Sequence, residues 1–210
     1  RAGAALYLLL VIGPVAALLA GAVLDGGELP WSALLTGRRL GLLAQSLGLA
    51  AATAAGGLLI GTLIALQLWR WRSPLAASLR WSFLILAPLP PSIHALAWSA
   101  AAAGLNGWLR AQGLVELPLR GWGASWWVQV MALLPIATGL ALVGLSAVDP
   151  ELVEAAQLLQ PDLRGLLRVA LPLAGPVILA GGALLFVLSL VDYAIPSLYQ
   201  LNVYALEIFA

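Results

Sequence analysis

The 210-residue chain contains no cysteine and a single histidine. Without cysteine it cannot form disulfides, thiolate nucleophiles or cysteine-ligated metal sites, and one histidine disfavours a conventional zinc site. Charge is scarce as well, because Asp, Glu, Lys and Arg make up 9% of the residues, against roughly 25% in ordinary soluble domains. Nine acidic and ten basic side chains cannot cover the surface of a soluble core of this size.

Several functional motifs are also missing. No G-x-x-x-x-G-K-[ST] loop or other nucleotide-binding pattern occurs, and no apolar run holds a Ser-His-Asp or paired-carboxylate arrangement. We therefore expect no enzyme activity, no catalytic residue, no metal ligand and no cofactor bound by this chain. A net charge of +1 gives no reason to expect a nucleic-acid partner.

What the sequence has in abundance is apolar surface: 62% of the residues are hydrophobic and the mean hydropathy is +1.01. Membrane lipid is the environment that such a surface needs. Runs close to the roughly 20 residues that cross a hydrocarbon core lie at about 4–24, 41–68, 82–103, 125–147 and 172–195. We therefore predict an all-α, polytopic transmembrane helical bundle with five spans in a single domain, 1–210.

The two ends of the sequence suggest a longer polypeptide. It starts with Arg1 instead of Met and stops at Ala210 without a polar tail. We expect a sixth span, or a second homologous half, to follow Ala210.

The arginines predict how the chain is oriented, because short cytoplasmic loops carry an excess of positive charge. The connection between the second and third spans and the one between the fourth and fifth both carry arginines, and we place both inside. These arginines are Arg70, Arg72 and Arg80 in the first connection, and Arg164 and Arg168 in the second. Arg38, Arg39, Arg110 and Arg120 then lie outside.

Two spans have unusual compositions. The second contains Gly57 and Gly61 four residues apart, and this small-xxx-small spacing lets helices approach closely. We favour packing within the chain over a dimer seam. The third contains Pro88, Pro90 and Pro91, which block a regular helix, so the chain must bend or unwind there. Irregular backbone at membrane depth needs protein or a watery cavity around it, which makes this span a candidate pathway wall.

The longest polar stretch, "DPELVEAAQLLQPDLRGLLRVALPLAGP", separates the fourth and fifth spans at 149–176. Asp149 is typical of a helix cap, Pro150 of the first helical position and Glu151 of the first turn. The apolar residues that follow recur at the three- and four-residue spacing of a short amphipathic helix. Gln160 and Pro161 end it, and a second short helix leads to the next span at Pro172.

This stretch resembles the EAA loop in the permease subunits of ABC importers. The resemblance covers about 41–195 and is carried by EAA at Glu154, Ala155 and Ala156, the aliphatic Val169, and Leu171-Pro172. The sequence departs from the family pattern at Gln160, where a glycine is usual, and in a spacing to Leu-Pro that is one residue shorter than the commonest form.

The resemblance implies a type I importer permease in the cell (inner or plasma) membrane, with the EAA loop in the cytoplasm. It implies that the loop at 148–171 forms a coupling helix, in which Glu154, Ala155, Ala156, Gln160, Leu171 and Pro172 transmit the closure of separate ATPase subunits. The other implied partners are a second permease domain and an extracytoplasmic solute-binding protein, with ATP-Mg held by the ATPase. The alternative for the short helix is a place in the membrane interface, but such helices are usually richer in Lys or Arg.

Three polar positions within the spans have both a functional and a structural explanation. His94 is a candidate ligand or proton relay, or a packed histidine that bonds a carbonyl freed by the prolines. Asp192 either faces the mouth of the pathway or caps a helix end. Gln45 and Ser46 either line a polar route or join helices by hydrogen bonds.

The stretch "LAPLPPSIHALAW" and the stretch around Asp192 and Pro196 resemble the ferric-iron, thiamine and polyamine-like branch of these permeases. Iron(III) is therefore the first solute that we expect. Two other classes remain open. A secondary transporter would use the proline-broken span and His94 for binding. A membrane scaffold would leave the prolines unexplained.

Overall fold

The computed structural model describes residues 37–71, 73–149, 151–152 and 166–209. The chain divides into two compact units, Arg1–Gly41 and Leu42–Ala210. The first unit contributes five described residues, 37–41, which form the first turn of a long helix. All further contacts described below lie within the second unit, and its described residues contain helices and no strand.

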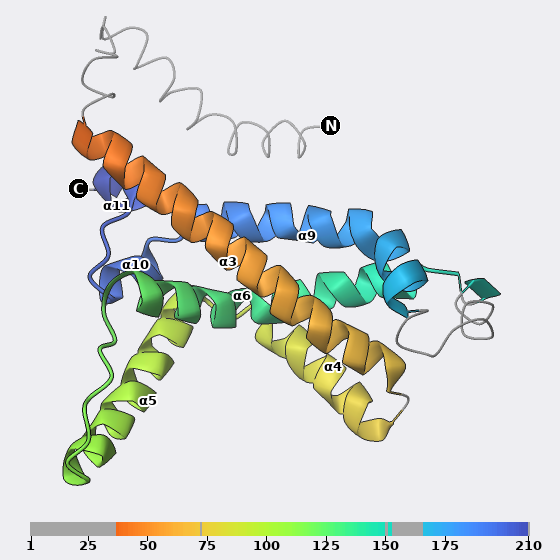
Figure 1. The fold of residues 1–210 in the computed structure, drawn as a ribbon, viewed down its shortest axis with the longest axis horizontal. Coiled ribbons are helices and arrows are strands. Elements are labelled where there is room, and N and C mark those ends of the chain that lie inside the picture. Colours follow the sequence, from red (N-terminus) through yellow and green to blue (C-terminus); the bar gives the residue numbers. More distant parts are fainter. Residues whose placement is uncertain (1–36, 72, 150, 153–165, 210) are drawn as a thin grey trace, which may run out of the picture. The chain divides into compact units, whose positions relative to one another are not determined.

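The described residues form three long helices, one pair of helices and several short elements, joined by connections (Figure 1). The long ones are α3 (Gly37–Arg70), α6 (Gly121–Ser146), α9 (Leu171–Val191) and the pair α4 (Pro74–Leu86) and α5 (Pro91–Ala111). The short ones are the π-helix η1 (Leu166–Ala170), α10 (Ala194–Leu198) and α11 (Tyr204–Phe209).

The helix α3 contains the whole of the predicted second span, 41–68. Its 34 residues span about 50 Å at 1.5 Å per residue, which exceeds a hydrocarbon core of about 30 Å and is accommodated by tilting. Arg70 lies in its last turn, where a positive charge interacts favourably with the negative end of the helix dipole.

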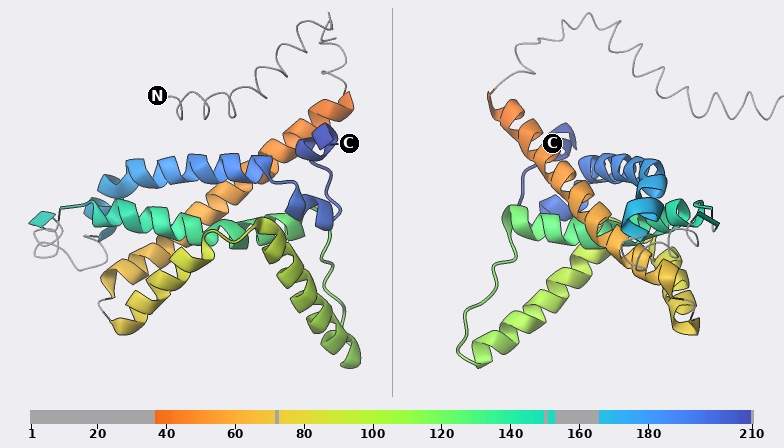
Figure 2. Two further views of the ribbon diagram at one scale, coloured as in Figure 1. Left: turned by 180° about the vertical axis from the view of Figure 1, so that it is seen from behind. Right: turned by 45° about the vertical axis from the view of Figure 1, so that its right-hand side comes forward.

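The helices α6 and α9 form the centre of the second unit and lie side by side in opposite directions (Figures 1 and 2). Close approach is possible because glycines alternate with bulkier partners across the seam. A Cβ on Gly144 would lie 3.2 Å from Val177 Cβ, and one on Gly181 would lie 3.2 Å from Leu140 Cβ. The sequence therefore places small residues where the two backbones need to be near.

The helix α3 crosses both α6 and α9 through its small-residue face (Figure 1). A Cβ on Gly61 would meet Ala137 Cβ at 2.7 Å, and one on Gly57 would meet Leu185 Cδ1 at 3.3 Å. Ala50 is fully buried. The prediction that this spacing serves packing within the chain is confirmed.

The third predicted span, 82–103, is a broken helix. Ser73 caps α4 by accepting a hydrogen bond from the Ala76 N–H at 3.2 Å, and Pro91 occupies the start of α5. The axes of α4 and α5 are bent by 111° at the break, which confirms that the prolines interrupt the helix. The predicted start at 82 lies within α4, which itself begins at Pro74.

The segment after α9 is anchored by Tyr199, whose side chain is 2% exposed. Its hydroxyl donates to the Ala95 carbonyl at 3.1 Å and accepts from Ser99 Oγ at 3.2 Å. Its carbonyl accepts from the N–H of Gly121 at 2.7 Å, a glycine whose φ of 74° suits a residue without a Cβ. This tyrosine therefore joins α10, α5 and the start of α6.

Three described helices are long and apolar enough to cross a membrane, and α4 with α5 makes a fourth crossing if the bent pair counts as one. This is compatible with a multi-pass membrane protein. The fourth and fifth predicted spans, 125–147 and 172–195, correspond to α6 and α9. The predicted first span, 4–24, lies outside the described residues.

Candidate functional site

A cavity of about 190 Å³ lies where the break between α4 and α5 meets α6 and the end of α9. Most of its wall is apolar, with one carboxylate, one amide and one hydroxyl. It is lined by Ala87, Pro88, Leu89, Pro90, Pro91, Gln129, Ala132, Leu133, Ile136, Leu188, Ser189, Asp192 and Ile195. Four of the five candidate pathway residues, the three prolines and Asp192, therefore line the same cavity.

The prolines form this wall because they end one helix and start the next. The Ala87 N–H caps the end of α4 by donating to the Phe83 carbonyl at 3.0 Å, and a turn follows in which the Leu89 N–H donates to the Leu86 carbonyl at 3.1 Å. Pro91 has no N–H to continue the ladder back to Ala87. Ala87 and the prolines face a cavity, which is the setting in which irregular backbone is tolerated at membrane depth.

Asp192 makes a structural contact at the end of α9 and also lines the cavity. Its Oδ1 accepts from the Ala194 N–H at 3.0 Å, which fixes the turn into α10. Its Oδ2 accepts from Gln129 Nε2 at 3.0 Å, and the residue lines the cavity. The carboxylate is thus both a structural element at the end of α9 and a part of the cavity wall.

Gln129 is a site residue that the sequence analysis missed. It lies on α6, is 1% exposed, and its Oε1 accepts from Thr53 Oγ1 of α3 at 3.1 Å and from Ser189 Oγ of α9 at 2.7 Å. Its Nε2 donates to Asp192. One amide therefore joins three helices to the carboxylate. The signal was a lone Gln within the apolar run "WWVQVMALL", since a buried amide needs partners.

His94 is the candidate pathway residue that does not line the cavity. It lies in the first turn of α5 and is half-buried. Its Nε2 is buried without a hydrogen-bond partner among the described residues. That atom therefore does not make the expected bond to a carbonyl freed by the prolines.

Of the predicted coupling residues, Glu154, Ala155, Ala156 and Gln160 lie outside the described residues. The flanks of the loop are described. Asp149 Oδ1 accepts from the Glu151 N–H at 2.9 Å, the bond expected of a helix N-cap. Leu171 and Pro172 form the first turn of α9, directly after η1.

The loop between α6 and α9 leaves the bundle at the same end as the arginine-bearing connection between α3 and α4. A hydrophobic cluster brings the three helix ends together: it contains Leu66 near the end of α3, Leu145 near the end of α6, and Ala174 near the start of α9. The predicted location of both connections on one side is consistent with this arrangement.

Ser46, on the first half of α3, joins segments as a hydrogen-bonding residue. Its Oγ donates to the Leu42 carbonyl at 2.9 Å and accepts from the Tyr204 N–H at 2.8 Å. Because its hydroxyl is used to hold the start of α11, the interhelical role fits it better than a polar route.

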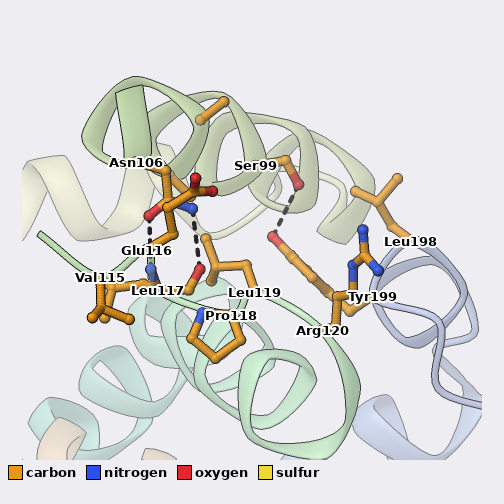
Figure 3. Close-up of a pocket in the computed structure, with 12 residues that line it drawn as sticks. Ser99, Asn106, Val115, Glu116, Leu117, Pro118, Leu119, Arg120, Leu198 and Tyr199 are labelled. Carbon is orange, nitrogen blue, oxygen red and sulfur yellow. Dashed lines mark hydrogen bonds between the residues drawn. The ribbon is translucent and has the colours of Figure 1, made fainter. Parts of the chain in front are cut away.

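A second, more open cavity of about 690 Å³ lies between α5, the connection 112–120 and Tyr199 (Figure 3). Asn106 holds the connection through two bonds with Leu117: Nδ2 donates to its carbonyl at 3.0 Å, and Oδ1 accepts from its N–H at 2.9 Å. Glu116 pairs with Arg110 at 2.8 Å on the surface, and this bond lowers the pKa of the Glu116 carboxyl.

Within the described part of the chain, no three or more His, Cys, Asp or Glu side chains are grouped so as to hold a metal ion. The first cavity therefore offers one carboxylate, held by an amide and framed by proline rings and aliphatic side chains. Such a wall can orient a polar or charged group in an otherwise apolar passage. No protein-family model matches the chain, and no curated protein matches it either.

Proposed function

We propose that the chain is a membrane-spanning permease subunit of an ATP-driven ABC importer. The observation that carries the proposal is the meeting of the proline break and Asp192 at one cavity between α6 and α9. A broken helix with a carboxylate beside it is the kind of polar passage wall that a transport protein needs and that a scaffold does not.

The resemblance at Glu154, Ala155 and Ala156 supports the importer class. In this proposal the loop around these residues docks in a groove of a separate ATPase subunit. The loop joins the ends of α6 and α9, which pack along their length. A pull on the loop therefore acts on Leu171 and Pro172 at the start of α9 and shifts this helix against α6.

The consequence for the cavity follows from the hydrogen bonds across that seam. Gln129 on α6 is bonded to Ser189 on α9 and to Asp192 at its end. Movement of α9 along α6 would break or exchange these bonds and reshape the wall that Asp192 contributes. This gives alternating access a physical basis in two discrete arrangements of packed helices.

The partners in this proposal are two ATPase subunits that bind ATP-Mg, a second permease domain, and an extracytoplasmic solute-binding protein. Iron(III) is the first candidate solute, because the stretches around Pro88 and Asp192 resemble the ferric-iron branch of these permeases. The protein would act in the cell membrane with the loop 148–171 in the cytoplasm.

A second candidate function is secondary transport, favoured by the 111° break between α4 and α5. Discontinuous helices with unwound backbone form the substrate and ion sites of many such transporters. This function needs no ATPase partner, and in it the loop 148–171 would have no role in energy coupling.

Co-purification with an ATPase distinguishes the two. We expect the tagged protein to capture an ATPase subunit, and Glu154→Lys or Ala155→Trp to reduce both capture and ATP-dependent uptake at least tenfold. The matched control is Glu116→Lys, a charge reversal on an exposed connection remote from the loop. Uptake that persists in the Glu154 and Ala155 variants, without any captured ATPase, would exclude the importer.

A further inference from the structure

A third hollow of the molecule, an apolar groove, runs between α4 and α6 with a volume of about 560 Å³. Its wall contains one charged residue, Arg80, and is otherwise apolar. The other lining residues are Ala77, Trp81, Phe83, Leu84, Ala87, Pro135, Ile136, Gly139, Leu140 and Leu142. It adjoins the cavity of the candidate site, because Ala87 and Ile136 line both.

The groove exists because α6 lacks bulk where it faces α4. A Cβ added at Gly139 would meet nothing within 4 Å, and the neighbouring Pro135 has a compact ring. On the other side Trp81 and Leu84 of α4 stand 65% and 63% exposed. An extended apolar occupant can therefore lie along α6 and be flanked by the side chains of α4.

One end of the groove carries positive charge. Arg80 Nη2 donates to the carbonyls of Leu68 and Trp71, the latter at 3.3 Å, which places its guanidinium at the end of α3, where Arg70 lies in the last turn. A guanidinium has five N–H donors, so donors remain for a further acceptor. Trp81 beside Arg80 is typical of the depth at which membrane proteins meet lipid headgroups.

The part of the chain that forms α3, α4 and α5 has no negative charge to compete for this site. Residues 29–115 contain no Asp or Glu, and their charged residues are Arg38, Arg39, Arg70, Arg72, Arg80 and Arg110. An occupant with an anionic head and an apolar tail matches both the charge and the shape of the groove.

We propose that the groove between α4 and α6 binds an anionic phospholipid, with its phosphate at Arg80 and an acyl chain along Gly139. Basic residues near the membrane surface attract anionic lipids, and the apolar groove adds burial of the chain. The inference depends on the membrane location of these helices, and it applies whether the protein is an importer or a secondary transporter.

The test is a titration of delipidated protein in detergent, followed by native mass spectrometry, with phosphatidylglycerol and zwitterionic phosphatidylcholine as probes. We expect tighter binding of phosphatidylglycerol. Arg80→Gln should weaken it about fivefold, the equivalent of about 1 kcal/mol for one basic residue at the surface. It should weaken phosphatidylcholine less, because the choline cation of that lipid neutralises its phosphate. Arg80→Lys, which keeps the charge, should retain most of the preference.

A second variant tests the groove itself. Gly139→Leu places a side chain into open space and should reduce binding of both lipids. Gly104→Leu, also open but on α5, is the matched control and should bind as the unchanged protein does. Equal affinity for both lipids, a preference that survives Arg80→Gln, or a dimer that Gly139→Leu dissociates would each overturn the proposal.

Discussion

Gln129 shows how one polar side chain can organise an apolar helix bundle. Its amide oxygen accepts hydrogen bonds from two hydroxyl groups, and its amide nitrogen donates one to a carboxylate. Inside a bundle such a network is stable only while every member has a partner. The residue therefore determines both the relative positions of α3, α6 and α9 and the orientation of Asp192.

Replacing Gln129 by Leu tests this role. The change leaves Thr53 and Ser189 without their acceptor and Oδ2 of Asp192 without its donor, and each buried group left unpaired costs about 1–3 kcal/mol. We expect a clear fall in the midpoint of thermal unfolding in detergent. Gln67→Leu is the control, because Gln67 is an exposed glutamine on α3. Equal midpoints for the two variants would show that the network is not stabilising.

Replacing two glycines on α3 by alanine should change the stability of the protein in opposite directions. Gly61→Ala brings a Cβ to 2.7 Å from Ala137 Cβ and 3.0 Å from its backbone, so α3 must shift, at a cost of about 1–3 kcal/mol. Gly48→Ala meets nothing within 4 Å and should stabilise the helix by about 0.5–1 kcal/mol. Thermal unfolding of the two variants measures the difference, and two shifts of the same sign would contradict the close approach.

At the scale of elements, the geometry of the pair α4 and α5 depends both on the local sequence and on the packing of the neighbouring helices. The prolines alone require a break, but the break faces a cavity because α6 and the end of α9 surround it. The pair also returns the chain from the end of α3 to the start of α6. The helices α3 and α6 run in the same direction. Trp126 Nε1 near the start of α6 donates to the Ala52 carbonyl of α3 at 3.0 Å, and Ala137 further along α6 lies next to Gly57 of α3.

The break can be measured directly, since the chain has no cysteine and spin labels can be placed on Ser78→Cys and Ala101→Cys. A continuous helix would separate these positions by about 35 Å at 1.5 Å per residue, and the bend makes the separation shorter. Replacing Pro88, Pro90 and Pro91 by Ala restores three N–H donors and should lengthen it. As a control, Pro135→Ala within α6 should leave the distance between the labels unchanged. If the triple change also leaves this distance unchanged, the bend is caused by packing alone.

The sequence predicts the long helices well because each is a single apolar run, and 41–68 and 125–147 agree with α3 and α6 within a few residues. It also predicts the break from the prolines. It cannot predict that Asp192 and Pro90 line one cavity, because that placement depends on how α9 lies against α6. Gln129 was missed for the same reason: a lone amide in an apolar run signals a partner without identifying it.

At the scale of the whole molecule, the described residues of the unit Leu42–Ala210 include a hydrophobic cluster at each of its two ends. One end gathers the connection from α3 to α4 and the flanks of the loop between α6 and α9. The other gathers Leu49, Leu201 and Val203 in a hydrophobic cluster near the start of α6. The positive-inside rule predicts that the first end, with Arg70 and Arg80, faces the cytoplasm.

Labelling of single cysteines in intact cells tests this orientation. Leu75→Cys in the first turn of α4 is exposed and lies at the end assigned to the cytoplasm, so a membrane-impermeant maleimide should not reach it. Val115→Cys, 89% exposed on the connection between α5 and α6, should react. Both should react after permeabilisation, which controls for accessibility of the thiols. The reverse pattern would place the loop 148–171 outside and would remove the cytoplasmic surface on which an ATPase has to dock.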